Sequence, residues 1–269
     1  MAAMRVLTAL TVLLLVGVTP ARAADPLAEA RRLYNTGDYE EAVRHAREAL
    51  GTATLADGAR LVLGRSYLEI FRRSADQADL AAAREALRDV NAETLDWRER
   101  AQLTIGFGQA LFLEGRFGSA SEMFERVLDT SVDLGRSAHE RVLDWWATAL
   151  DRLALSRPVS AREELYLRIV ERMQRELAVD PASAPAAYWM AAGLRGAGDL
   201  ERAWHAAAAG WISATLARDR GAALRADLDR LVTRGIIPDR AARLQPKDPH
   251  PAGAVMLAEW EGFKTVWSR

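Results

Sequence analysis

The stretch that decides the fold is 104-TIGFGQALFLEGRFGSASEMFERV-127. In its first half, Phe107 and Leu111 stand four residues apart, which places both on one apolar side of a helix. Gly108, next to Phe107, leaves room for a neighbouring helix to approach closely. Gly115 follows the last apolar turn, where a residue in the left-handed conformation commonly ends a helix. The sequence therefore predicts a helix that ends close to residue 115.

The second half of this stretch predicts a return helix. It starts at Phe117, and Ala120, Phe124 and Val127 follow at spacings of i, i+4 and i+7. That spacing places the three side chains on one side of the return helix, and this apolar side can pack against the first helix. The stretch is therefore expected to form a two-helix hairpin, with Phe124 as a large side chain and Gly108 as a gap on the facing helix.

The same arrangement of residue types recurs along the chain, which indicates a repeat. The copies combine small and large residues on a first helix with an alanine on the return helix, and all but the second have a glycine at the turn. The residues expected to pack between helices are Ala30, Gly37 and Ala42 in the first copy; Gly64, Tyr67 and Ala83 in the second; Phe107, Gly108, Leu111, Gly115, Phe117, Ala120 and Phe124 in the third; and Ala191, Gly198 and Ala203 in the last.

These positions resemble the tetratricopeptide repeat family. The resemblance implies an all-α fold, a right-handed α-solenoid of helical hairpins. It also implies that the first helix of each hairpin lines a concave face on which peptides are held. Carried over repeat by repeat, the residues expected to line that face are Arg31, Tyr34, Leu61, Arg65, Leu68, Ile105, Gln109, Phe112 and Tyr188.

Two units depart from the regular pattern. After Tyr67 the residues 72–79 are expected to form an extended connection before the return helix resumes at Leu80. Residues 142–150 are predicted to form a first helix and 161–178 its return helix, in a degenerate repeat that has lost its turn glycine. Trp146 is expected to face the partner helix, and Trp145 a different side.

The C-terminal fifth leaves the repeat. Residues 222–232 predict a helix stopped by Gly235, and 251–267 predict a final helix. That last helix carries a stripe of large apolar residues, which is expected to cap the open end of the repeats, because a solenoid must bury its terminal faces. A partner protein or a membrane surface is the alternative cover for the stripe. The stripe consists of Met256, Trp260, Phe263 and Trp267.

The N-terminal segment has the pattern of an export signal. A short positive start precedes the apolar run 6–18, and Ala21 and Ala23 form a small-x-small cleavage site. Cleavage is expected after Ala23, with retention as an anchor as the alternative, so the protein would be periplasmic or secreted. The expected organisation is a signal peptide over 1–23, helical repeats over 24–216 and capping helices over 217–269.

Composition excludes several classes of chemistry. The chain has no cysteine, so it has no disulfide, thiolate metal site or cysteine nucleophile. Its four histidines are scattered without a pair at i+3 or i+4, and no phosphate loop or serine-nucleophile motif occurs. We therefore expect no catalytic residue, no metal and no cofactor. The net charge of −1 becomes −3 without the two arginines of the export segment, which argues against a nucleic-acid partner.

These observations predict a non-enzymatic scaffold of the cell envelope that binds a protein or peptide on its concave face. Two alternatives remain. A glycan-processing α/α-barrel enzyme is also built from helical hairpins, and it would show two buried carboxyl groups facing one cavity with raised pKa values. An envelope assembly factor would instead bind through the Trp260 and Trp267 side of its last helix.

Overall fold

The computed structural model describes residues 25–217, 219 and 221–268, and every regular element in these residues is a helix. This confirms the all-α prediction. The segment expected to be a signal peptide lies outside the described residues. Among the described helices, none has the length and the continuous apolar sequence that a membrane-spanning helix needs. The α-helices are α1 (Pro26–Thr36), α2 (Tyr39–Ala49), α3 (Ala56–Ser74), α4 (Gln77–Arg88), α5 (Trp97–Leu113), α6 (Phe117–Leu128), α7 (Arg136–Leu155), α8 (Glu163–Val179), α9 (Ala184–Gly196), α10 (Leu200–Ser213), α11 (Ala222–Leu231), α12 (Ile237–Leu244) and α13 (His250–Trp267).

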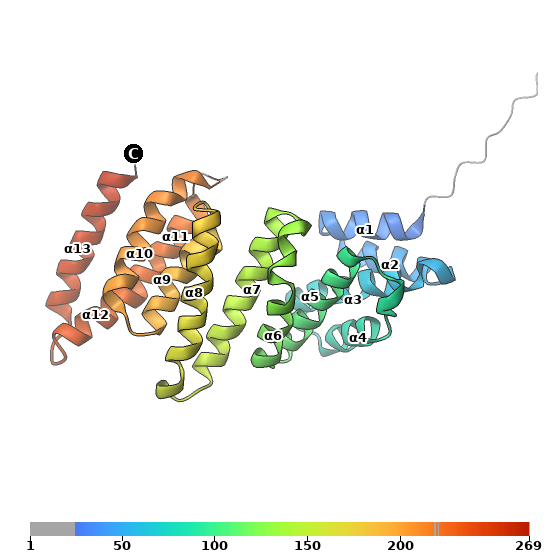
Figure 1. Cartoon of the computed structure of the whole chain (residues 1–269), viewed down its shortest axis with the longest axis horizontal. Helices are drawn as coiled ribbons and strands as arrows, with labels where there is room; N and C mark the ends of the chain where they lie inside the picture. Colours follow the sequence, from blue (N-terminus) through green and yellow to red (C-terminus); the bar gives the residue numbers. More distant parts are fainter. Residues whose placement is uncertain (1–24, 218, 220, 269) are drawn as a thin grey trace, which may run out of the picture.

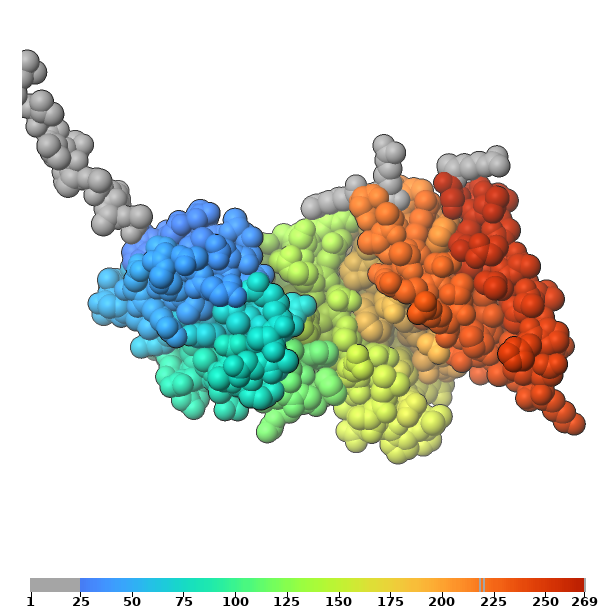
Figure 2. Space-filling model, turned by 180° about the vertical axis from the view of Figure 1, so that it is seen from behind, coloured from blue at the N-terminus to red at the C-terminus, as the bar shows by residue number. Residues whose placement is uncertain are grey.

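The helices follow one another along the long axis of the molecule, with α1 near one end and α13 at the other (Figure 1). The view from behind shows the same order from the N-terminal to the C-terminal part (Figure 2). Each helix packs mainly against its neighbours in the chain: α1 against α2, α3 against α4, α5 against α6, and α9 against α10. The hairpin units predicted from the repeats are therefore present.

The turns of the α1–α2, α5–α6 and α9–α10 hairpins share one geometry. Gly37, Gly115 and Gly198 have φ values of +84°, +76° and +84°, the left-handed region that glycine enters without steric strain. Each turn is closed by the same backbone hydrogen bond, which the amide of the residue after the glycine donates to a carbonyl five residues earlier. These bonds join Asp38 to Leu33 (3.0 Å), Arg116 to Leu111 (2.8 Å) and Asp199 to Leu194 (2.9 Å).

Glycines on the first helices let the paired helices come into close contact. A Cβ atom at Gly108 would lie only 2.7 Å from Cε1 of Phe124, and one at Gly64 only 2.5 Å from Cγ of Leu87. Phe124 and Leu87 are both fully buried. The gap at Gly108 and the large side chain at Phe124 thus meet as the sequence predicted.

Two predicted connections are wrong. Residues 72–79 do not form an extended segment, because α3 continues to Ser74 and only two residues separate it from α4. Ala75 takes the left-handed role that glycine has in the other turns, with φ of 56°, and the Asp76 carboxylate then accepts a hydrogen bond from the amide of Ala78 at 2.9 Å. Gly235 does not stop the helix either, since a π-helical segment, Val232–Ile236, leads directly into α12.

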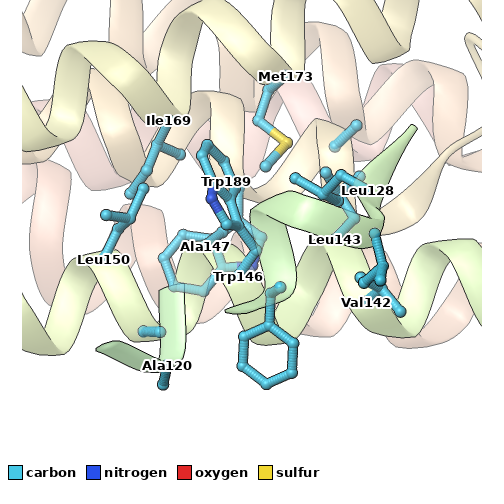
Figure 3. Close-up of a cluster of buried hydrophobic side chains, with 14 of the residues drawn as sticks. Ala120, Leu128, Val142, Leu143, Trp146, Ala147, Leu150, Ile169, Met173 and Trp189 are labelled. Atoms are coloured by element: carbon cyan, nitrogen blue, oxygen red, sulfur yellow. The ribbon is translucent and has the colours of Figure 1, made fainter. Parts of the chain in front are cut away.

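In the middle of the chain, tryptophans fill the space between helices. Trp146 and Leu150 of α7 are buried as predicted, in a cluster that also holds Trp189 of α9. Figure 3 shows the two indole rings at the centre of this cluster, near Ile169 and Met173 of α8. Helix α7 packs more closely against α6 than against α8, and α8 more closely against α9. The α7–α8 unit is therefore a looser pair than the hairpins before it.

The last helix packs against the repeats through part of its apolar stripe. Met256 and Trp260 are buried, Phe263 is half-buried, and Trp267 is half-exposed. The Trp260 ring lies between Trp204 and Trp211 of α10, with centroids 5.6 and 5.5 Å away. The alternative in which Trp260 forms an external binding surface is wrong, because its side chain has no exposed area. One hydrophobic cluster runs from α8 to α13, so the core is continuous across residue 216.

Replacement of Gly108 by Leu is expected to disrupt the middle of the molecule. The new side chain would occupy the volume of the Phe124 ring, and overpacking of a dense core destabilises by about 1–3 kcal/mol or more. Urea unfolding followed by circular dichroism should show a lower midpoint or a separate early transition. Gly118→Ala in the same hairpin is the control, because its Cβ would lie 3.7 Å from Leu153, an ordinary contact. A Gly108→Leu variant as stable as the control would contradict this account of the packing.

The capping role of α13 predicts different effects for its two tryptophans. Trp260→Ala should lower the free energy of unfolding by about 3–5 kcal/mol, because it leaves a cavity among Trp204, Trp211 and Phe263. Trp267→Ala should have a small effect, since this side chain is 50% exposed. Chemical denaturation of both variants measures the difference. Equal stabilities would show that α13 does not close the core.

Candidate functional site

The first helices of the N-terminal hairpins surround a hollow of about 490 Å³. We call the surface formed by α1, α3, α5, α7, α9 and α11 the first-helix face. We call this cavity the arginine hollow, because four arginines line it. It is lined by Tyr34, Asn35, Tyr39, Arg65, Glu69, Arg72, Arg98, Gln102, Ile105, Gln109, Leu134, Ala138, Arg141, Val142 and Trp145.

Four of the predicted ligand-binding residues meet in the arginine hollow. Tyr34 comes from α1, Arg65 from α3, and Ile105 and Gln109 from α5. Arg31 lies in an adjoining depression of about 210 Å³, where its guanidinium pairs with the carboxylate of Glu99. Four of the residues expected to line the ligand-binding face therefore line one hollow, between helices of the N-terminal half.

The other predicted residues lie elsewhere. Leu61 and Leu68 are only 2% and 1% exposed and belong to the core, although Leu61 contributes to the wall of the depression at Arg31. Phe112 packs its ring edge-on against Trp145, with centroids 4.9 Å apart, and supports the wall from behind. Tyr188 is on α9, where it lines two hollows of about 410 and 560 Å³ in the C-terminal half of the face. The structure thus divides the predicted set into a lining group, a core group and one distant residue.

Several lining residues were not predicted, although the sequence contains a signal for them. Arg98, Gln102, Ile105 and Gln109 recur on α5 at i, i+4, i+7 and i+11, a stripe along one side of a helix. The prediction included only the last two of these. Trp145 was expected to face away from its buried neighbour Trp146, and this is confirmed, since it lines the hollow. A search for polar stripes on the first helices would have found the α5 group.

Aromatic rings and an amide hold two of the arginines in place. The Arg65 guanidinium lies 4.3 Å from the centroid of the Tyr34 ring and donates to Oε1 of Gln102 at 2.7 Å. The Arg72 guanidinium on α3 lies 5.3 Å from the centroid of the Trp145 ring on α7. Its Nη1 also lies 2.9 Å from Oε2 of Glu69, with which it forms an ion pair. Guanidinium groups over aromatic faces are stabilised by cation–π attraction. The hollow is therefore an ordered, positively charged surface with aromatic walls.

The C-terminal half of the first-helix face is more acidic. Burial raises the pKa of the Tyr188 hydroxyl, and the carboxylates of Asp227, Asp151 and Asp144 raise it further. Two of these carboxylates are engaged in the core: Asp144 accepts from Nε1 of Trp189 at 2.8 Å, and Asp151 accepts from the Tyr166 hydroxyl at 3.0 Å. The charge of the face thus changes from positive at the arginine hollow to negative around Tyr188.

One group of side chains has the residue types of a hydrolytic triad. Nδ1 of His139 lies 2.8 Å from Oγ of Ser131, and Nε2 of the same ring lies 2.9 Å from Oε2 of Glu176. Ser131 has no exposed area, however, and its Oγ donates to the Leu128 carbonyl at 2.7 Å. A nucleophile must reach its substrate. This group therefore connects the segment before α7 to α7 and α8 and provides no reactive serine.

The described residues give no support to the glycan-processing alternative. Each carboxyl group in them whose pKa departs clearly from its ordinary value has a lowered pKa. The backbone amide of Asn91, for example, donates to Asp57 at 3.0 Å and lowers the pKa of that carboxyl. A general acid would need the opposite shift. Over the same residues, no group of three histidine, aspartate or glutamate side chains could hold a metal ion.

Comparison with known proteins adds no further assignment: no family model matches the chain, and no curated protein matches it. The candidate site therefore depends on the geometry described above.

Tyr166 predicts a loss of stability at alkaline pH. Burial of its phenol, followed by the nearby Asp151 carboxylate, raises its pKa from 10.0 to about 12. The folded protein keeps a proton that the unfolded chain releases, so this contribution to stability is full below pH 10 and is lost as pH rises to about 12. Urea unfolding across that range should show a steeper fall for wild type than for Tyr166→Phe. Equal pH dependence would contradict the role of this hydroxyl.

Proposed function

We propose that this protein is a non-enzymatic interaction module that holds a peptide segment of a partner protein on its first-helix face. In this proposal the hairpins form a right-handed α-solenoid, and the first-helix face is its concave side. The N-terminal pattern of a positive start, an apolar run and a small-x-small site supports export, so the partner would be met in the periplasm or outside the cell.

The observation that carries the proposal is the continuity of the hollows along this face. The small depression at Arg31 shares Tyr34 and Arg65 with the arginine hollow. The arginine hollow shares Arg141 with the next hollow, and that hollow shares Tyr188 with the last one. A series of neighbouring hollows that share lining residues, from α1 to α11, suits an extended chain better than a compact small molecule. Residues on a rigid scaffold that face such a groove are typical of binding surfaces.

Blocking the arginine hollow should abolish peptide binding. We would select binders from a library of random peptides on the purified protein and measure their affinities for variants by fluorescence anisotropy. Ile105→Trp places a large side chain in the hollow and should weaken binding at least about tenfold. Leu167→Trp is the matched control, because Leu167 is an exposed apolar residue on α8, outside the hollow. Circular dichroism would show that both variants fold.

The outcomes separate the possible sites. If Ile105→Trp binds as tightly as the control, the peptide does not occupy this hollow. If Trp267→Ala instead removes binding, the site lies on the C-terminal helix and the proposal is wrong.

A further inference from the structure

The arginine hollow has an excess of positive charge that the described protein does not neutralise. Of its four arginines, Arg72 pairs with Glu69, which also lines the hollow. Within the described part of the chain, no carboxylate oxygen lies within 4.0 Å of the guanidinium nitrogens of Arg65, Arg98 or Arg141. These three arginines come from α3, α5 and α7, which are far apart in sequence. The tertiary fold thus gathers three guanidinium groups without acidic partners around one cavity.

Many other arginines of the described chain do have acidic partners. Arg136 contacts Glu140 and Asp180, Arg168 contacts Glu125, and Arg172 contacts Asp129 and Glu176. The chain as a whole carries a net charge of −1, so acidic residues are available in sufficient number. Arginines without an acidic partner also occur elsewhere in the described chain, but three of them line this one cavity. That local excess of positive charge would favour an anionic occupant.

One side-chain amide at the same cavity is open to a ligand. Gln109 lines the hollow, and its side chain makes no hydrogen bond to another described residue. Its amide atoms are not among the buried, unpartnered atoms of the described residues, so they are accessible from the cavity. A side-chain amide has both donors and an acceptor, which match the C=O and N–H of a peptide backbone. Gln109 therefore identifies a place where the hollow could receive a peptide group.

The neighbouring hollow limits where an anionic chain can extend. Beyond Arg141 the face is lined by Glu140, Asp144 and Asp227. Like charges repel at this range, so an acidic segment is disfavoured there and favoured over α1, α3 and α5. The three arginines also carry more positive charge than a single C-terminal carboxylate could neutralise. The match is therefore with several acidic side chains in sequence.

We propose that the arginine hollow binds an acidic internal segment of a peptide, with Asp or Glu side chains paired to Arg65, Arg98 and Arg141 and with a backbone group hydrogen-bonded to Gln109. This inference deepens the proposed function and depends on it. Tyr34, Ile105 and Trp145 form the walls against which the remaining side chains pack.

The test uses a library of random twelve-residue peptides with blocked ends, selected on the wild-type protein and on an Arg98→Glu/Arg141→Glu double variant. Both replaced residues are exposed, so the fold should be retained. We expect Asp and Glu to be enriched on wild type and Lys and Arg to be enriched on the variant. For the best acidic binder, Arg98→Gln and Arg141→Gln should each weaken binding about tenfold, and added salt should weaken it further. Arg175→Gln is the control, because Arg175 is an exposed arginine on α8 away from the hollow.

Each result has a distinct meaning. Peptides without acidic enrichment that are still blocked by Ile105→Trp would overturn this inference and leave the proposed function intact. A parallel library with free C-termini provides the second comparison. Binders to the hollow that come only from the library with free C-termini would overturn the assignment of an internal acidic segment and leave the proposed function intact. Failure of both libraries to yield a binder to the hollow would overturn both the inference and the proposed function.

Discussion

The close approach of paired helices at glycine is the constraint on which the rest of the structure depends. At Gly108 and Gly64 a single Cβ atom would collide with Phe124 or Leu87 of the partner helix. Helices α3 and α5 thereby each turn one side toward the partner helix, and buried alanines on the return helices, Ala83 and Ala120, also allow close packing. Close packing of this kind fixes the rotation of each helix about its own axis, because a side chain cannot leave its gap without breaking the contact.

Fixed rotation is what turns separate helix sides into one functional surface. With Gly108 turned toward Phe124, the stripe of Arg98, Gln102 and Ile105 on the same helix is left facing the neighbouring first helices. The same holds on α3, where Arg65 and Glu69 line the hollow while Leu61 and Leu68 enter the core. The arginine hollow is thus a consequence of how the hairpins pack, since no loop is needed to form most of its wall.

The C-terminal half adds large indole side chains to close glycine contacts such as that of Gly196 with Tyr166. Trp146, Trp189, Trp204 and Trp260 fill the spaces between its helices. A buried indole needs a partner for its N–H group. Asp144 accepts that hydrogen bond from Trp189, and Asp229 accepts it from Trp260 while it also pairs with Lys264. Several acidic residues of this half are therefore structural, in contrast to the arginines of the other half.

The sequence by itself determined the helical class, the hairpin units, the left-handed turn glycines and the contact between Gly108 and Phe124. All of these follow from periodicity and backbone conformation within about twenty-five residues, and such local terms can be evaluated without the rest of the chain. Only the tertiary structure decided that Leu61 and Leu68 are core residues, that Ala75 replaces a turn glycine, and that Arg98 and Arg141 share a cavity with Arg65. Which side of a helix remains exposed depends on helices distant in the sequence. Three arginines on three helices become one charged site only when packing brings α3, α5 and α7 together.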